Sequence, residues 1–458
     1  MERDGTERDG TERATSEPHV HEHDGTDIDV VVVGAGLAGL TAAATAARAG
    51  ASVLVLDGHP RGGRARTTVV DPGVTFNSGP RAWYLGGPGA NELDALGIRP
   101  RGSAPLASTG HVLVDGRRHL MPATPGQLLR TGALRARSKV AVASLLARVP
   151  RIEAGSLVGR TVDEWLADTG LAPDAAALVR AIVRLATYVD APDRMDAGAA
   201  VAQLQMVLGE GVRYLDGGFA QLVGSLADDA ERHGARILEH EAVRSIERVG
   251  VGWLVRTAER EHRARAVVIA AGAPAACDAL SPVPFDRSAL TEPVTAACLE
   301  LGVAGTPDTP FLLSIDEPLY LSQHSPPADL SPDGVSVVHV LRYGTSASAE
   351  ADRDQLWAQA AAAGIDARKV VAQRFLRRMV VTGSVPTAAS GGLAGRPPVQ
   401  VPGAEGLLLA GDWVGPQGML ADAAVASGAN AGRAAAASVA AAAARGGRPA
   451  PSPAGTTG

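Results

Sequence analysis

Cysteine and lysine are scarce in this chain of 458 residues, and each scarcity excludes a class of site. The two cysteines, Cys277 and Cys298, do not form a Cys-x-x-Cys pair, so neither a disulfide framework nor a dithiol redox centre is expected. A reducing cytoplasm is therefore the expected location. The two lysines, Lys139 and Lys369, do not occur in a Gly-Lys-Ser/Thr sequence, which excludes a P-loop nucleotide site.

Long uncharged apolar stretches are also missing. No run of about 18 apolar residues occurs, and the charged N-terminus has no apolar core, so we predict neither a transmembrane helix nor a signal peptide. The net charge is −6 and the basic residues are spread along the chain, so a nucleic-acid-binding surface is not indicated. Residues 120–150 combine arginines with Leu, Val and Ala. Such a basic amphipathic stretch is more often a solvated helix face, and peripheral contact with a membrane is the alternative.

The hydrophobic content of the chain predicts a folded protein with a disordered tail at each end. Hydrophobic residues make up 46% of the chain, enough for a sizeable core, and the length fits two or three domains. The first 26 residues repeat Glu-Arg-Asp-Gly-Thr and carry almost nothing apolar, so we expect a disordered tail over 1–26. The Gly-, Pro- and Ser-rich end, 446–458, is expected to be a second disordered tail.

A strand-helix-strand pattern begins at Ile28. Ile28–Val33 is a short apolar run, as expected for a strand buried on both faces, and Ser52–Leu56 is a second one. Between them, Leu37–Ala49 consists mostly of small residues and is followed by Gly50, which is typical of a helix and its end. This order predicts a βαβ unit.

The turn before this helix reads Gly34-Ala35-Gly36-Leu37-Ala38-Gly39. Gly34 permits a tight turn, Gly36 lets a pyrophosphate approach the backbone, and Gly39 lets helix and strand pack closely. The helix N-terminus offers unpaired N–H groups to the phosphates. Asp57 lies at the end of the second strand, 18 residues after Gly39, where its carboxylate can accept hydrogen bonds from ribose hydroxyls. These features together predict a dinucleotide site.

The next segment, Gly62-Gly63-Arg64, follows Asp57 within ten positions. Its glycines allow a close approach to the backbone, and Arg64 can pair with a pyrophosphate or lie along a flavin's polar edge. Taken alone, the segment is equally a turn with solvated arginines. Together with Asp29–Gly39 and Asp57, it resembles the start of the flavin-containing amine oxidase and phytoene desaturase-like superfamily. The resemblance implies FAD contacts at Gly34, Gly36, Leu37, Ala38, Gly39, Asp57, Gly63 and Arg64.

Two later segments resemble the same superfamily. Tyr214–Ile246 is similar to an internal segment whose backbone, at the position of Val243, meets the adenine. Leu407–Gly428 is similar to the C-terminal FAD motif, in which the Asp contacts the ribityl or pyrophosphate region. In that motif, the helix that follows points its N-terminus at the flavin N1/O2 edge, where it stabilises the negative charge of the reduced flavin. The resemblance thus adds FAD contacts at Val243, Gly411, Asp412 and Leu420.

The strand pattern and the resemblance together predict an α/β fold with a discontinuous, Rossmann-type FAD-binding domain and an inserted α+β substrate domain. Apolar strands are expected near the start, middle and end of the chain, so the FAD-binding domain must be assembled from separate segments. We assign 27–100, 205–280 and 400–445 to the FAD-binding domain, and 101–204 and 281–399 to the substrate domain.

The activity that the resemblance implies is that of a FAD-dependent oxidoreductase in which flavin N5 accepts a hydride from an organic substrate. Monoamine-oxidase-type members often carry a lysine near N5, but the matching strand, Val294–Val303, has none. We therefore favour a dehydrogenase- or desaturase-like reaction on a largely apolar substrate. The alternatives are an amine oxidase that releases peroxide and a FAD-binding partner protein without turnover. No catalytic residue can be assigned, and no metal site is predicted.

Three further expectations concern the surroundings of the flavin. No Cys or His lies between residues 404 and 435, so FAD is predicted to be bound non-covalently. No second G-x-G-x-x-G follows a strand, so O₂ or a quinone is the expected electron acceptor. Aromatic residues make up only 3% of the chain, which supplies few rings for an amine cage. Trp413 is the aromatic residue best placed to line the pocket, with Trp83, Tyr84, Tyr188 and Tyr320 as further candidates.

Overall fold

The computed structural model describes residues 22–23, 28–106 and 109–446. The tails predicted for 1–26 and 446–458 lie outside these residues, except for the two-residue strand β1 (Glu22–His23) and for Gly446, which ends the last helix. In the described part of the chain, no helix is long and apolar enough to cross a membrane.

Three segments that are far apart in the sequence form one eight-stranded sheet. Its strands are β1, β2 (Ile28–Val33), β3 (Val53–Asp57), β11 (Arg236–Glu239), β12 (Ser245–Val249), β13 (Gly252–Arg256), β14 (Arg260–Ile269) and β20 (Leu407–Leu409). The order is β11-β3-β2-β14-β13-β12, with β1 and β20 also paired to β14. β11, β3, β2, β14 and β20 are parallel, so their carboxyl ends meet at one edge of the sheet.

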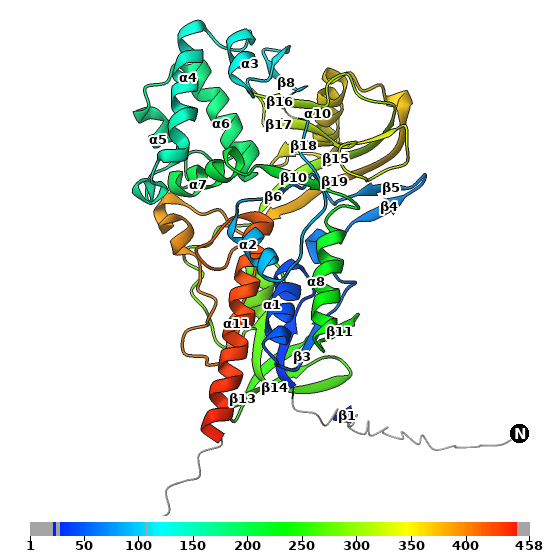
Figure 1. Cartoon of the computed structure of the whole chain (residues 1–458), viewed down its shortest axis with the longest axis vertical. Helices are drawn as coiled ribbons and strands as arrows, with labels where there is room; N and C mark the ends of the chain where they lie inside the picture. The colour runs from blue at the N-terminus through cyan, green and yellow to red at the C-terminus, as the bar shows by residue number, and fades with distance from the viewer. Residues whose placement is uncertain (1–21, 24–27, 107–108, 447–458) are drawn as a thin grey trace, which may run out of the picture.

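Both faces of this sheet are buried. Three helices cover one face (Figure 1): α1 (Leu37–Arg48), α8 (Ala220–Arg232) and α11 (Leu420–Gly446). Val30 and Val32 of β2 pack against these helices, whereas Val31 and Val33 belong to the apolar cluster on the opposite face. Burial on both faces explains why β2 and β3 consist almost entirely of valine and leucine instead of alternating with polar residues.

A seven-stranded sheet lies at the other end of the molecule (Figure 1). Its strands, in spatial order, are β19 (Val370–Thr382), β15 (Val294–Ala304), β18 (Val335–Tyr343), β17 (Leu319–Ser325), β16 (Phe311–Ser314), β8 (His111–Val114) and β9 (Arg117–Leu120). α10 (Ala349–Ala362) packs on one face, where Leu356 and Ala360 meet Leu299 and Leu301. The other face meets a helical group of α3 (Pro125–Arg130), α4 (Ala136–Arg148), α5 (Val162–Asp168), α6 (Pro173–Thr187) and α7 (Ala197–Leu208).

Short elements complete the described fold. They are the strands β4 (Thr68–Val70), β5 (Val74–Phe76), β6 (Trp83–Tyr84), β7 (Gly102–Ser103) and β10 (Val212–Leu215), and the helices α2 (Pro88–Ala95) and α9 (Pro274–Leu280). β10 pairs with both β6 and β7. It therefore links segments on the two sides of the limit expected between residues 100 and 101. The domain limits themselves stay a prediction.

The predicted α/β architecture is confirmed, with one local correction. β2 has the predicted bounds, α1 ends one residue earlier than predicted, and β3 is shifted by one residue. Residues 236–246 have the alternating sequence of a single strand, but the strand is interrupted: β11 ends at Glu239, and His240 has a φ of 62°. The chain turns there because it has reached the edge of the sheet, where Glu241 N donates to Asp57 O at 2.8 Å.

Candidate active site

A cavity of about 570 Å³ lies where the parallel strands of the first sheet end. This edge is where open α/β sheets bind their ligands. The walls come from the turn after β2, the loop after β3, the ends of β14, β19 and β20, and the first turn of α11. Eleven of the twelve residues predicted to bind the cofactor line it: Gly34, Gly36, Leu37, Ala38, Asp57, Gly63, Arg64, Val243, Gly411, Asp412 and Leu420.

The glycines of the first turn have different surroundings. A Cβ on Gly39, the predicted residue that does not line the cavity, would lie 1.8 Å from Gly34 O, so this glycine lets α1 pack against the turn. Gly34 has a φ of 105°, and a Cβ there would lie 2.4 Å from Ala270 O. A Cβ on Gly36 would meet no protein atom within 4 Å. The space beside Gly36 is therefore open for a ligand, as a bound pyrophosphate requires.

Asp57 stands at the end of β3, at the same end of the cavity as Val243 and the break after β11. Its Oδ2 accepts the Ala35 N–H at 2.7 Å, and its Oδ1 accepts the His59 N–H at 2.9 Å. These bonds fix the carboxylate next to the glycine turn. Each carboxylate oxygen can accept more than one hydrogen bond, so capacity for a ribose hydroxyl remains.

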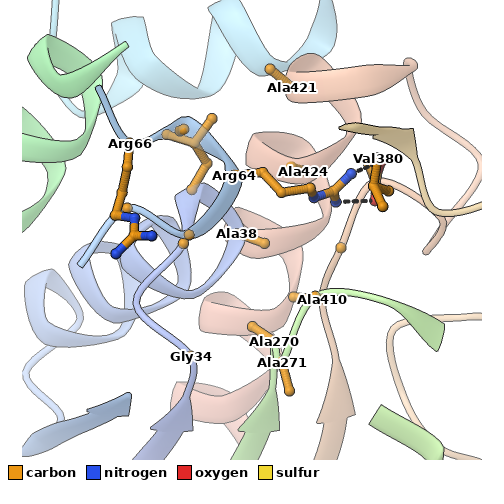
Figure 2. Close-up of a pocket in the computed structure, with 18 of the residues that line it drawn as sticks. Gly34, Ala38, Arg64, Arg66, Ala270, Ala271, Val380, Ala410, Ala421 and Ala424 are labelled. Carbon is orange, nitrogen blue, oxygen red and sulfur yellow. Dashed lines mark hydrogen bonds and ion pairs between the residues drawn. The ribbon is translucent and has the colours of Figure 1, made fainter. Parts of the chain in front are cut away.

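Arg64 and Asp412 were predicted as separate cofactor contacts, and the structure pairs them. Arg64 Nη1 donates to Asp412 Oδ2 at 3.0 Å and Nη2 donates to Oδ1 at 2.7 Å. Figure 2 shows Arg64 reaching across the cavity toward Val380, and Arg66 also lines the cavity. Burial opposes ionisation of Asp412, but Arg64 and the Gly383 N–H hold the pKa of this carboxyl below its usual range.

Arg81, which the sequence analysis did not single out, also lines the cavity. Its Nε donates to Asn77 O at 3.0 Å and its Nη2 donates to Arg64 O at 2.5 Å. Burial, followed by the nearby charge of Arg64, lowers the pKa of Arg81 to about 10. Arg81 therefore adds a second guanidinium beside the Arg64–Asp412 pair, and it forms no hydrogen bond to a carboxylate within the described residues.

Glu300 anchors the loop that carries Arg81 through a hydrogen bond to the backbone of Gly79. This residue lies on β15, the strand that lacks a lysine, and is fully buried. Its Oε1 accepts the Gly79 N–H at 2.8 Å, and its Oε2 accepts from Arg374 Nε at 2.5 Å. Burial opposes the charge, but His339 and Arg374 lower the pKa of Glu300 to about 2. An ionised carboxylate thus anchors one wall of the cavity.

Only some of the aromatic residues lie as expected. Tyr84 and Tyr188 line the cavity, as does Phe219, but Trp413, Trp83 and Tyr320 do not. The expectation for Trp413 is wrong because its ring is fully buried beneath the site: it stacks on Phe285, and its Nε1 donates to Gly272 O at 2.8 Å. Its position next to Asp412 in sequence was misleading, since adjacent side chains point in different directions.

The first turn of α11 forms another wall of the cavity. Leu420, Ala421 and Ala424 line it, and Figure 2 shows Ala421 and Ala424 on this helix. Asp422 is fully buried, and its Oδ1 accepts the Gly89 N–H at 2.7 Å. Its Oδ2 has no hydrogen-bond partner. Burial therefore raises the pKa of Asp422 to about 6.

Replacing Asp422 by asparagine is expected to stabilise the flavin-free protein at pH 7.5 but not at pH 4.5. The pKa of this group is raised from 3.8 to about 6 on folding. The contribution of Asp422 to the free energy of unfolding is therefore fully present below pH 3.8 and is lost as the pH rises through about 6. Asparagine removes that loss and keeps an oxygen for Gly89, for a gain on the order of 1 kcal/mol. Urea unfolding at the two pH values measures it. An equal difference at both would contradict the assignment.

The residues around the cavity fit a dinucleotide that carries a flavin. The open face of Gly36, the N-terminus of α1 and the side chains of Arg64 and Arg66 suit a pyrophosphate. Asp57 suits the adenosine ribose, and the first turn of α11 suits the electron-rich edge of a flavin. These are the regions that the resemblance to FAD-binding proteins implied.

Comparison with solved structures finds the same fold. An oxidoreductase from Methanosarcina mazei has a TM-score of 0.68 at 17% identity, over 88% of this chain and 99% of the other. Cyclohexylamine oxidase from Brevibacterium oxydans IH-35A has a TM-score of 0.65 at 21% identity, over 92% of this chain and 100% of the other. Putrescine oxidase bound to putrescine has a TM-score of 0.66 at 16% identity, over 91% of this chain and 99% of the other. No curated protein sequence matches.

The sequence itself identifies the family. The sequence model described as flavin containing amine oxidoreductase matches residues 37–436, which is most of the chain. The match includes the last three residues of the glycine turn, the Arg64–Asp412 pair and the first turn of α11. The chain is therefore a FAD-dependent oxidoreductase and belongs to the flavin-containing amine oxidoreductase family.

Proposed function

We propose that the protein removes a hydride from a largely apolar organic substrate, in a dehydrogenase- or desaturase-like reaction. The observation that carries the proposal is that the described wall of the cavity offers no carboxylate to an ammonium group. Its two carboxylates, Asp57 and Asp412, are both engaged within the protein.

Neither carboxylate suits an ammonium group. Asp412 is in a two-point contact with Arg64, and Asp57 accepts two backbone N–H groups next to the glycine turn. A protonated amine that entered would lose its hydration without gaining an ion pair, which is costly for a buried charge. A neutral substrate has no such penalty.

The part of the wall formed by β19 and α11 is apolar. Met379, Val380 and Val381 face it from the end of β19, and Leu420 and Ala421 from α11. Tyr84 and Tyr188 add two rings, but the Tyr84 hydroxyl donates to Ala186 O at 2.6 Å and the Tyr188 hydroxyl contacts that of Tyr320 at 2.8 Å. Both hydroxyls are thus satisfied within the protein. Such a wall desolvates an apolar substrate at little cost.

FAD, when bound, supplies the acceptor for the hydride. The chain's own contribution is to orient the substrate and to exclude water. Glu300 fixes the loop that carries Arg81, and the Arg64–Asp412 pair joins that side of the cavity to β20. No side chain of the described wall is assigned as a general base, in keeping with a reaction whose chemistry belongs to the cofactor. Attachment is proposed to be non-covalent, since neither cysteine lines the cavity.

Anaerobic reduction of the bound flavin tests the proposal. Flavin bleaching is followed by absorbance after mixing with neutral hydrocarbon-like donors, such as isoprenoids, steroids and cyclic alkenes, or with aliphatic amines of matched size. Turnover is then measured with O₂ or a quinone as acceptor. Bleaching by the neutral donors supports the proposal. Bleaching by amines alone, with peroxide released in air, would establish amine oxidation instead. Flavin that no donor bleaches would indicate a binding protein without turnover.

A further inference from the structure

Residues 116–152 contain eight arginines and lysines and no aspartate or glutamate, in a chain whose net charge is −6. The centre of this segment is a pair of helices, α3 (Pro125–Arg130) and α4 (Ala136–Arg148), followed by Arg151. We call residues 125–151 the basic hairpin. A solvated helix face ordinarily carries charges of both signs, spaced to pair with one another. The basic hairpin carries one sign only.

The cations of the basic hairpin are also unpaired. Within the described residues, Arg130, Arg135, Arg137, Lys139, Arg148 and Arg151 form no ion pair with a carboxylate. The side chains that are bonded donate only to backbone oxygens, as Lys139 Nζ does to Leu129 O at 2.8 Å and Arg148 Nε to Ser144 O at 3.2 Å. The nearby carboxylate of Asp174 is occupied by the Arg135 backbone N–H and the Ser138 hydroxyl. The positive charge is therefore free to meet an external partner.

Two large aliphatic side chains of the basic hairpin are exposed. Leu129 is 73% exposed and Val140 is 71% exposed, whereas Leu128, Leu134, Val142 and Leu145 of the same basic hairpin are buried in the core. On α4, the exposed Val140, Ala143 and Ala147 are flanked by the exposed Arg137 and Arg148. A helix with an aliphatic centre and a basic rim on its outer face is typical of binding at a membrane interface, where the aliphatics enter the headgroup layer and the cations attract anionic lipids.

The position of the basic hairpin suits such contact. Figure 1 shows α3 and α4 at the end of the molecule opposite the first sheet, so a flat surface can approach them freely. α6 packs against α4 and ends at Thr187, and the next residue, Tyr188, lines the cavity. One helix thus separates the basic hairpin from the proposed site of an apolar substrate.

We propose that the basic hairpin docks the protein on an anionic membrane surface. The exposed aliphatics favour a lipid surface over an acidic protein, because they share one helix face with cations, and headgroups with acyl chains below them meet both needs. Attraction to anionic headgroups falls with ionic strength, because salt screens exposed charges.

Sedimentation with vesicles tests this proposal on the flavin-loaded full chain and requires no substrate, so its outcome is independent of the proposed function. We expect binding to vesicles of equal parts phosphatidylglycerol and phosphatidylcholine, and little binding to phosphatidylcholine alone. Arg137→Glu with Arg148→Glu should weaken binding at least about tenfold. Val140→Ser should weaken it by about threefold.

Matched variants at the opposite end of the molecule provide the control. Arg260→Glu with Arg263→Glu changes two exposed arginines of β14, and Val251→Ser changes a valine that is 89% exposed. Neither should alter vesicle binding. The proposal is wrong if the wild type does not sediment with anionic vesicles or if it binds neutral vesicles equally well. It is also wrong if the β14 variant loses as much binding as the basic-hairpin variant. In the first case an acidic protein becomes the partner to examine.

Discussion

Replacing Gly39 by alanine is expected to lower the free energy of unfolding by about 3 kcal/mol, whereas the same change at Gly36 is expected to leave it nearly unchanged. The added methyl group at position 39 would lie 1.8 Å from Gly34 O, and backbone atoms cannot move aside without separating α1 from the glycine turn. At position 36 the methyl group meets no protein atom within 4 Å and enters the cavity instead. Gly36→Ala should therefore keep its fold and lose its FAD.

Urea unfolding of the flavin-free proteins and flavin content after purification measure the two effects separately. Gly224→Ala is the matched control, because Gly224 also lies inside a helix, α8, and an added Cβ there would meet nothing within 4 Å. Helix propensity alone should stabilise that variant by up to about 1 kcal/mol. If Gly39→Ala behaved like Gly224→Ala, the close packing of α1 on the turn would be refuted. Full flavin content in Gly36→Ala would place the pyrophosphate elsewhere.

Replacing Arg64 by alanine is expected to cost about 2 kcal/mol of stability and most of the bound flavin. The substitution leaves the Asp412 carboxylate, which is 2% exposed, without the guanidinium that holds it in a two-point contact. A fully buried pair would cost more to break, but Arg64 is 36% exposed, so solvent recovers part of the loss. Stability is read from urea unfolding of the flavin-free protein, and flavin affinity from titration.

Arg66→Ala is the appropriate control for Arg64→Ala. Arg66 lines the same cavity two residues further on, is exposed, and has no side-chain ion pair among the described residues. Its loss should weaken FAD binding without changing the unfolding free energy. The double variant Arg64→Ala with Asp412→Ala should be more stable than Arg64→Ala alone, since the buried charge is then removed as well. A double variant that is less stable would show that Asp412 is held mainly by other groups.

The parts of the site that could be predicted from the sequence are those encoded locally. The glycine turn, Asp57 and the Gly63-Arg64 segment lie within 31 residues, so spacing alone brings them to one end of a βαβ unit. The contacts after Leu407 came from resemblance to a family, and the structure brings them to the same cavity. That Arg64 and Asp412 bind one another could not be predicted, because 348 residues separate them and each was considered only against the cofactor.

Arg81 and Glu300 were missed for a related reason. Arg81 looks like one more arginine in a chain rich in them, and its role depends on a loop held by a strand more than 200 residues away. Glu300 did carry a signal, since it is a single carboxylate within the apolar sequence of β15. A charge in a buried strand is rare unless it is paired. The sequence of β15 thus indicates a buried ion pair as well as lacking a lysine.

The late position of β20 and α11 in the chain determines when the cofactor can be captured. Both come from residues 407–446, the last segment that the structure describes, yet β20 pairs with β14, and α11 forms a wall of the cavity. A chain emerges from the ribosome N-terminus first, so the glycine turn, Arg64 and β14 are exposed before Asp412 and Leu420 have been made. Until then one side of β14 is an unpaired apolar edge, open to wrong partners. FAD uptake is thus expected only after residues 407–446 have been synthesised, and ribosomal stalling before residue 407 is expected to release a chain prone to aggregate.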